Sequence, residues 1–255
     1  MNDYFSITAL HYLNAGATGH DHFHFLLNAV ISEINIASLP ELNTIYAHVL
    51  YKGHGKDKTS ERAYRTISTC PLISKAADMY VRELSKDDWN LKQADTQFQG
   101  EGSSHELAAL LLKETIQHSL HTSNLPVYAL FLDAKSAFDR VLKELLVRNL
   151  FFAGTDDQRL LYLDQRLKNR KTYCEYDHQL MGPILDDHGL EQGGVSSSDA
   201  YKLYNNEQLE VSQRSGFGVM VRGMTISSIG LADDVVTSPS SLVSSTAFLI
   251  RNPTH

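Results

Sequence analysis

Residues 227–239 read SSIGLADDVVTSP, in which Asp233 and Asp234 stand side by side between two short apolar runs. Both runs have strand propensity, so we expect a β-hairpin with the two acids at its bend. Aspartate is common in tight turns, because its side chain bonds nearby backbone and tolerates unusual dihedral angles. Adjacent carboxylates also repel one another unless a cation or a base neutralises them. The pair therefore fits either a simple turn or a cation site, and other parts of the chain must distinguish the two.

A third acid, Asp133, ends the apolar run VYALFLD at residues 127–133, which we expect to be a buried strand. If this strand and the hairpin are neighbours in one sheet, three carboxylates meet at one edge. Such a cluster suits magnesium, a hard cation that takes carboxylate and phosphate oxygens. Two such ions can serve an in-line phosphoryl displacement. Taken alone, an aspartate in the position of Asp133 is more often the N-cap of a helix that follows it.

Candidate phosphate ligands occur in a basic segment near the middle of the first half of the chain. From Tyr51 to Lys75 there are six lysines and arginines but only two acids. Such a patch can bind phosphate within an acidic chain, although it also fits a solvated loop. Further along, Gln192 and Gly193 begin a glycine-rich loop that would let the backbone approach a ligand closely. A loop glutamine in solvent is the simpler alternative.

The composition is that of a soluble domain. The chain has 255 residues, 42% of them hydrophobic, and a formal net charge of −7, which argues mildly against a polyanionic partner. No run of eighteen apolar residues and no secretory leader is visible, so we expect no membrane association and an intracellular location. The two cysteines, Cys70 and Cys174, form neither a disulfide framework nor a metal-ligand pattern.

Helical and strand patterns alternate irregularly along the chain. Helices are expected in the first forty residues, from Pro71 to about Leu84, after a Ser103–Glu106 capping box, from residue 136 to Gly154, and over 159–170. A final helix is expected after the glycine-rich loop, with Ser198 or Asp199 as its N-cap. A β-hairpin with a basic tip is expected at about 44–69, and another strand at 171–177. This mixture of helices and antiparallel hairpins predicts the α+β class.

Three ordered motifs resemble those of a known family. The segments FLDAKSAFDRV (131–141), GLEQGGVSSSDAYKLYNN (189–206) and GLADDVV (230–236) are similar to motifs A, B and C of reverse transcriptases of non-LTR, LINE-type retrotransposons. The upstream segments YKGHGKDKTSERAYRTIS (51–68) and TQFQGEGSSHELAALLL (96–112) resemble the fingers segment and the segment before motif A. The resemblance covers nearly the whole chain from about Thr8.

The resemblance implies a fold, a reaction and a set of ligands. It implies an N-terminal segment with fingers over residues 1–125 and a palm with an antiparallel sheet and packed helices over 126–255. The implied activity is RNA-directed DNA polymerisation, in which the 3′-hydroxyl of a DNA primer on an RNA template attacks a deoxynucleoside triphosphate with the help of two Mg²⁺ or Mn²⁺ ions. The resemblance implies that Asp133, Asp233 and Asp234 bind the metal ions and form the catalytic site.

The resemblance also implies a nucleotide pocket. Phe138 would be an aromatic gate that excludes a 2′-hydroxyl, although without the motif it would be a core residue of an amphipathic helix. Arg65 is the best candidate for a triphosphate contact and Lys56 a weaker one, while Gln192 and Gly193 would line the pocket. Asp139 is expected to be structural.

The chain departs from the family pattern in several places. Leu231 replaces the usual aromatic residue two before the acid pair, and Thr66 replaces a proline in the fingers motif. The sequence ends at His255 without the later palm motifs or a thumb, so we expect a truncated element. An inactive retroelement relic that keeps the palm fold and binds nucleic acid weakly is therefore one alternative. Another palm-type nucleotidyl transferase or cyclase is a second, although it does not explain Gln192 and Gly193. The sequence does not indicate the oligomeric state.

The histidines of HDHFHF (residues 20–25) alternate in a segment whose pattern is helical. In a helix such side chains point apart, so zinc binding is not expected there. The segment GHGKDKTS lacks the first glycine of a phosphate-binding P-loop, and we reject that motif as well.

Overall fold

The structure is a computed structural model that describes residues 9–32, 39–53, 55–99, 102–123, 127–168, 170–177 and 179–237. The predicted break at residues 124–126 and the chain end at 238–255 lie outside these ranges. The chain divides into two compact units, and neither is continuous in sequence. The first unit comprises residues 1–91 and 138–200, and the second comprises residues 92–137 and 201–255. These units do not coincide with the segments 1–125 and 126–255, whose assignment as fingers and palm stays a prediction.

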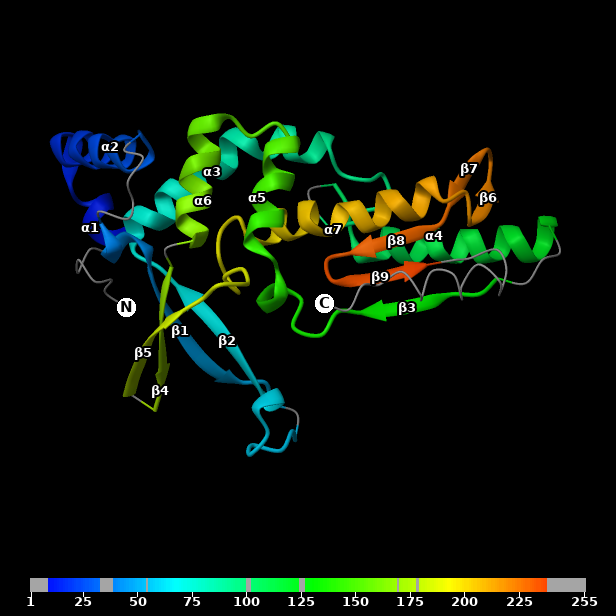
Figure 1. Cartoon of the computed structure of the whole chain (residues 1–255), viewed down its shortest axis with the longest axis horizontal. Coiled ribbons are helices and arrows are strands. Elements are labelled where there is room, and N and C mark those ends of the chain that lie inside the picture. Colours follow the sequence, from blue (N-terminus) through cyan, green and yellow to red (C-terminus); the bar gives the residue numbers. More distant parts are fainter. Residues whose placement is uncertain are drawn as a thin grey trace. The chain divides into compact units, whose positions relative to one another are not determined.

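The first unit contains a four-stranded sheet with the order β2-β1-β4-β5 (Figure 1). Its strands are β1 (Thr44–Tyr51), β2 (Tyr64–Thr69), β4 (Lys171–Tyr176) and β5 (Gln179–Leu185). β1 and β2 are antiparallel and pair from Tyr46–Thr69 to Tyr51–Tyr64, which confirms the expected hairpin. β4 pairs with β1 in parallel and with β5 in antiparallel orientation.

Helices complete the first unit. They are α1 (Ala9–Leu13), α2 (Gly16–Ser32), α3 (Leu72–Leu91), α5 (Lys143–Phe152) and α6 (Asp157–Lys168), with short 3₁₀ turns at Pro40–Asn43, Glu61–Ala63 and Phe138–Arg140. The buried side chains of α3 include Ile73, Ala77, Val81, Ser85 and Trp89. Their four-residue spacing gives the helix one continuous buried stripe, which stabilises it against the rest of the unit.

The second unit is built on a three-stranded antiparallel sheet with the order β3-β9-β8. The strands are β3 (Leu130–Asp133), β8 (Ser228–Leu231) and β9 (Asp234–Thr237). A separate hairpin joins β6 (Val219–Val221) to β7 (Met224–Ile226). The helix α4 (His105–His118), which continues as a π-helical turn at Ser119–Ser123, contacts β8. Its buried Ala108 packs with Ile226 and Ile229 in the core of the unit.

The last helix, α7 (Ser197–Arg214), begins in the first unit and continues in the second. Its start at Ser197 corrects the expected N-cap at Ser198 or Asp199. The N-cap of α4 is Ser104, whose hydroxyl accepts a hydrogen bond from Leu107 N at 3.3 Å, so the prediction of Ser103 was wrong by one residue. The α+β class is confirmed, with an antiparallel sheet and packed helices in the second unit. In the part of the chain that the structure describes, no helix is long and apolar enough to cross a bilayer.

Candidate functional site

The acid pair lies on the β8–β9 hairpin. Leu231 is the register partner of Asp234, so Ala232 and Asp233 form a two-residue turn. Ala232 has a φ of 59°, and Asp233 is not among the residues with positive φ. A positive φ at the first turn position alone is the pattern of a type II′ turn, which matches the twist of a tight hairpin. The predicted hairpin with its acids at the bend is confirmed.

The third acid lies opposite the pair. β3 and β9 are antiparallel neighbours, and their register places Asp133 directly across from Asp234. Residues directly opposite one another in an antiparallel pair project from the same face, with Cβ atoms about 5 Å apart. The strand that was expected to bring Asp133 to the hairpin does so. Asp133 ends its strand and does not cap a helix, because the next α-helix begins only at Lys143.

The three acids differ in burial and position. Asp133 and Asp234 are exposed, whereas Asp233 at the turn is half-buried. Over the described residues, no set of three or more histidine, cysteine, aspartate or glutamate side chains is gathered closely enough to hold a metal ion. The backbone therefore places Asp133 and Asp234 as immediate neighbours and Asp233 next in the chain, without a ready three-donor cluster.

Helix α7 supports the acidic hairpin from within the second unit. Asn205 Nδ2 donates a long hydrogen bond to Ala232 O at 3.5 Å. A Cβ atom on Gly230 would come within 2.9 Å of Leu209 Cδ1, so the helix packs directly against β8. Burial, together with the charge of Asp233, raises the pKa of Tyr201 to about 12. These contacts were not predicted from the sequence, although the spacing 201, 205, 209 marks one face of the helix.

The free edge of β8 is covered by a short segment before α4. Gly230 N donates to Thr96 O at 2.9 Å, and Phe98 N donates to Gly230 O at 2.8 Å. Gln97 forms the corresponding parallel bridge with Gly230. These bonds hold β8, the strand that leads into the acidic turn, along the edge opposite β9.

The predicted nucleotide-binding residues all lie in the first unit. Ser68 N on β2 donates to Gln192 O at 2.8 Å. Gly193 has a φ of 101°, and a Cβ atom there would lie 3.5 Å from Ile67 Cγ2. Ile67 and Arg65 are two residues apart on β2, so their side chains project from the same face. The structure therefore brings Gly193 to the face of β2 from which Arg65 projects.

Phe138 is tied to the same loop by the backbone. Leu190 N donates to Phe138 O, and Gly189 N donates to Val141 O, both at 2.8 Å. The expected helix from residue 136 is corrected to the 3₁₀ turn Phe138–Arg140 followed by α5, because these long-range bonds bind the backbone outside any helix. Phe138 is half-buried on that turn rather than on the core face of a helix.

Lys56 lies apart from this group, in the loop beyond the ends of β1 and β2. Its backbone oxygen accepts a hydrogen bond from Tyr51 Oη at 2.5 Å, and its side chain is exposed. Arg65 pairs with Leu50 within the strands. The structure thus groups Arg65, Gln192 and Gly193 and leaves Lys56 at the hairpin tip.

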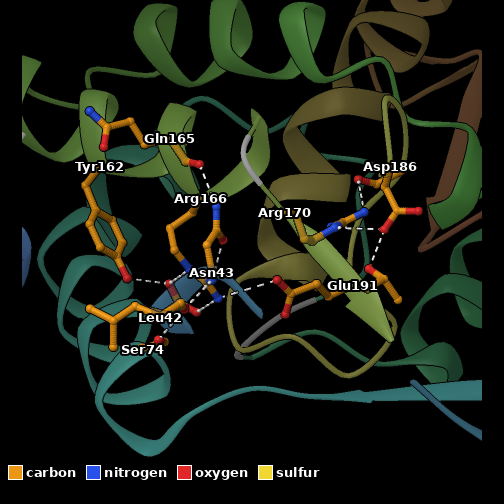
Figure 2. A network of polar contacts seen from close by, with 12 residues as sticks. Leu42, Asn43, Ser74, Tyr162, Gln165, Arg166, Arg170, Asp186 and Glu191 are labelled. Atoms are coloured by element: carbon orange, nitrogen blue, oxygen red, sulfur yellow. Dashed lines mark hydrogen bonds and ion pairs between the residues drawn. The ribbon is translucent and has the colours of Figure 1, made fainter. Parts of the chain in front are cut away.

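The residue before Gln192 is anchored in a buried polar network (Figure 2). Arg166 on α6 forms a two-pronged ion pair with Asp78 at 2.9 and 3.2 Å, and it lies 3.4 Å from Glu191. It also donates to Asn43 Oδ1 at 2.7 Å. Tyr162 Oη donates to Asp78 at 2.7 Å. Burial raises the pKa of Glu191, and the Arg166 guanidinium opposes that shift.

A second arginine holds the segment just before Glu191. Arg170 donates to Gly189 O at 3.2 Å. It also contacts Asp186 at 3.3 Å, as Figure 2 shows. A cavity of about 40 Å³ lies beside the network, lined in part by Arg166, Glu191 and Gly194. It is too small for a nucleotide, since ligand pockets usually measure about 300–1,000 Å³. This network was not predicted from the sequence, because its members are scattered along the chain.

Solved structures share the fold of this chain. The chain resembles apo telomerase from Candida tropicalis truncated from its C-terminal domain, with a TM-score of 0.59, 13% identity, and coverage of 89% of this chain and 51% of that chain. Apo telomerase from the same organism matches with a TM-score of 0.58 and 12% identity, over 89% of this chain and 45% of that chain. Telomerase from this organism in complex with the TWJ fragment of telomeric RNA matches with a TM-score of 0.56 and 13% identity, over 83% of this chain and 38% of that chain.

By sequence, no protein-family model and no curated protein matches the chain. The chain spans about half or less of the telomerase structures that it resembles. Identities this low show the fold alone. Since telomerase is a reverse transcriptase, the fold of this chain is reverse-transcriptase-like.

Proposed function

We propose that this chain supplies the fingers and palm of an RNA-directed DNA polymerase of the non-LTR retrotransposon type. The observation that carries the proposal is the strand register that sets Asp133 opposite Asp234, with Asp233 in the adjoining turn. A simple hairpin turn does not need a third acid on the neighbouring strand. The order of the three motifs in the sequence supports the retrotransposon assignment, and the reverse-transcriptase-like fold supports the polymerase class.

The acids have the chemistry of a magnesium or manganese site. All three offer carboxylate oxygens, the donors that hard divalent cations prefer. Asp133 and Asp234 lie opposite one another and repel, so a cation between them would relieve that repulsion. Asp133 and Asp233 would be the main ligands, and Asp234 would complete the acidic cluster. When bound, two such ions lower the pKa of an attacking hydroxyl and stabilise the charge on a leaving oxygen.

The first unit would bind the incoming nucleotide. Arg65, an exposed cation on β2, would contact the triphosphate, with Lys56 as a weaker contact. Gln192 and Gly193, which lie against β2, would line the base and sugar. The half-buried Phe138 would exclude a 2′-hydroxyl. The proposed partners are an RNA template, a DNA primer and deoxynucleoside triphosphates, which is in keeping with the telomerase that was solved with an RNA fragment.

Primer extension on an RNA template tests this proposal. The wild-type chain, given Mg²⁺ or Mn²⁺, should extend a DNA primer, and Asp133→Asn and Asp233→Asn should each abolish extension. Asp87→Asn is the matched control, because Asp87 is an exposed acid on α3. Extension that survives Asp233→Asn unchanged would show that the site is wrongly assigned. A folded wild-type chain that extends no primer would favour the inactive relic, and nucleotide transfer without a template would favour another palm-type transferase.

A further inference from the structure

Three tyrosines gather at the end of the four-stranded sheet, on strands β1, β2 and β4. Tyr51 and Tyr64 are register partners, with ring centroids 5.7 Å apart. Tyr176 meets Tyr64 edge-on, with centroids 6.4 Å apart. Tyr51 is 38% exposed and Tyr176 is 51% exposed, so both present ring surface to solvent. We call Tyr51, Tyr64 and Tyr176 the tyrosine platform.

Two of the three hydroxyl groups of the platform bind the loop beside it. Tyr51 Oη donates to Lys56 O, and Tyr64 Oη donates to Lys58 O at 3.0 Å. Asp57 in the same loop accepts hydrogen bonds from the backbone and hydroxyl of Thr59 at 2.9 and 2.8 Å. These bonds fix the loop and hold the hydroxyls of Tyr51 and Tyr64 against it.

The segment that carries two of the three tyrosines is basic. Residues 51–65 contain five lysines and arginines against two acids, in a chain whose net charge is −7. Lys52 and Lys58 are exposed, and Lys58 Nζ lies 5.6 Å from the centroid of the Tyr51 ring. A cation and an aromatic face at one place are the two components of surfaces that bind single-stranded nucleic acid, where bases stack on rings and lysines neutralise phosphates.

We propose that the tyrosine platform binds single-stranded nucleic acid, with unpaired bases stacked on Tyr51 and Tyr176 and phosphates neutralised by Lys52 and Lys58. A duplex would not satisfy the surface, because its bases are already stacked on one another and hidden from the rings. The surface goes beyond the proposed polymerase site, since it requires neither the three acids nor a nucleotide. Its binding is therefore measurable in a chain that polymerises nothing.

Fluorescence anisotropy with a labelled oligouridylate of about 12 nucleotides tests the proposal. The whole chain is used in EDTA, without nucleotides, at salt concentrations from about 50 to 200 mM. Removing both rings, in Tyr51→Ala/Tyr176→Ala, should weaken binding about tenfold or more. Tyr51→Phe/Tyr176→Phe keeps the rings and should bind within about threefold of the wild type. Tyr80→Ala is the matched control, because Tyr80 is an exposed tyrosine on α3.

The lysines are tested by salt dependence. Log affinity falls as log salt concentration rises, and each phosphate contact to a single strand makes this slope steeper by about 0.7. Lys52→Gln/Lys58→Gln should therefore make the slope shallower by about 1.4. Lys75→Gln/Lys113→Gln removes the same charge from exposed positions on α3 and α4 and should leave the slope unchanged. Fluorescence of Trp89 confirms that each platform variant keeps the first unit folded.

Several results would overturn the proposal: no binding by the wild type, equal binding by the double alanine variant, or equal affinity for a duplex of the same length. Asp233→Asn should bind the oligonucleotide like the wild type. A wild-type chain that binds the oligonucleotide but does not extend a primer would support the platform proposal and contradict the polymerase proposal. If the variant without both rings extends a primer normally and binds the strand as tightly as the wild type, the polymerase proposal is supported and the platform proposal is contradicted.

Discussion

Replacing Arg166 by methionine should destabilise the first unit strongly. The guanidinium is 6% exposed and bonds to Asp78, Asn43 and Leu42 O, with Glu191 at 3.4 Å. Its removal leaves two carboxylates in the protein interior without their cation. Breaking a buried ion pair by removing one partner costs about 3–5 kcal/mol, because the remaining charge is left uncompensated.

Urea unfolding followed by tryptophan fluorescence measures this loss. Trp89 is the only tryptophan of the chain, and it lies 1% exposed in the first unit, where its indole donates to Thr155 at 2.8 Å. Its emission therefore reports the unfolding of the unit that holds Arg166. With a urea dependence of about 2 kcal/mol per molar, the midpoint should fall by about 2 M.

Lys168→Met is the matched control for this measurement. Lys168 lies on the same helix and forms an ion pair with Asp164 at 2.8 Å, but its side chain is 53% exposed. Such a pair contributes less than about 0.5 kcal/mol, so the midpoint should barely move. A free energy of unfolding for Arg166→Met within about 1 kcal/mol of the wild type would refute the reasoning.

A second comparison separates charge from packing. If the loss comes from uncompensated charge, adding Asp78→Asn and Glu191→Gln to Arg166→Met should restore a large part of the lost stability. Two buried amides cost less than two buried carboxylates without a cation. A triple variant that is no more stable than Arg166→Met would show that lost packing around the long Arg166 side chain, rather than charge, sets the cost.

Three other outcomes follow from the same unit. Burial raises the folded-state pKa of Glu191 above its ordinary value of 4.5, so the folded state binds this proton more tightly than the unfolded state does. The free energy of unfolding should therefore fall as the pH rises from about 4.5 through that pKa. Glu191→Gln should reduce this fall, as measured by urea midpoints from Trp89 fluorescence. Burial raises the pKa of the Cys70 thiol to about 12, so at pH near 8 iodoacetamide should label Cys70 at least about 100-fold more slowly than free cysteine, as peptide mass spectrometry would show; equal rates would contradict the burial. Gly189 has a φ of 89°, and a Cβ atom there would lie 3.0 Å from Asp139 O, so Gly189→Ala should cost about 1–3 kcal/mol; an unchanged midpoint would contradict the close approach.

The elements nearest the acids could be predicted from sequence because their signals are local. Strand propensity flanks Asp233 and Asp234, and the apolar run before Asp133 is too short and uninterrupted for an amphipathic helix. The placement of β3 beside β9 was a conditional expectation, because pairing between strands about a hundred residues apart leaves no trace in either strand alone. The register confirms the condition.

The larger errors share a physical cause. Residues 136–142 have a helical pattern, yet hydrogen bonds from Gly189 and Leu190 hold this backbone outside a helix. The partners of Arg166 lie up to 124 residues away in sequence, so no periodicity could reveal them. The parallel pairing of β4 with β1 was missed for the same reason. Local propensity predicts elements, while tertiary bonds decide where some of them begin and which ones meet.

The β8–β9 turn carries features that stability alone does not favour. Ala232 has a φ of 59°, a conformation that costs an L-residue about 1–2 kcal/mol and that glycine adopts freely. Asp133 and Asp234 face one another as like charges, which destabilises an antiparallel pair. A threonine opposite another threonine would favour the strands more. Local rules that are broken together, at one turn, in an otherwise well-supported sheet, are expected where a sequence serves chemistry. The strain and the charge therefore point to the same place as the motifs do, and for a reason that does not depend on the family resemblance.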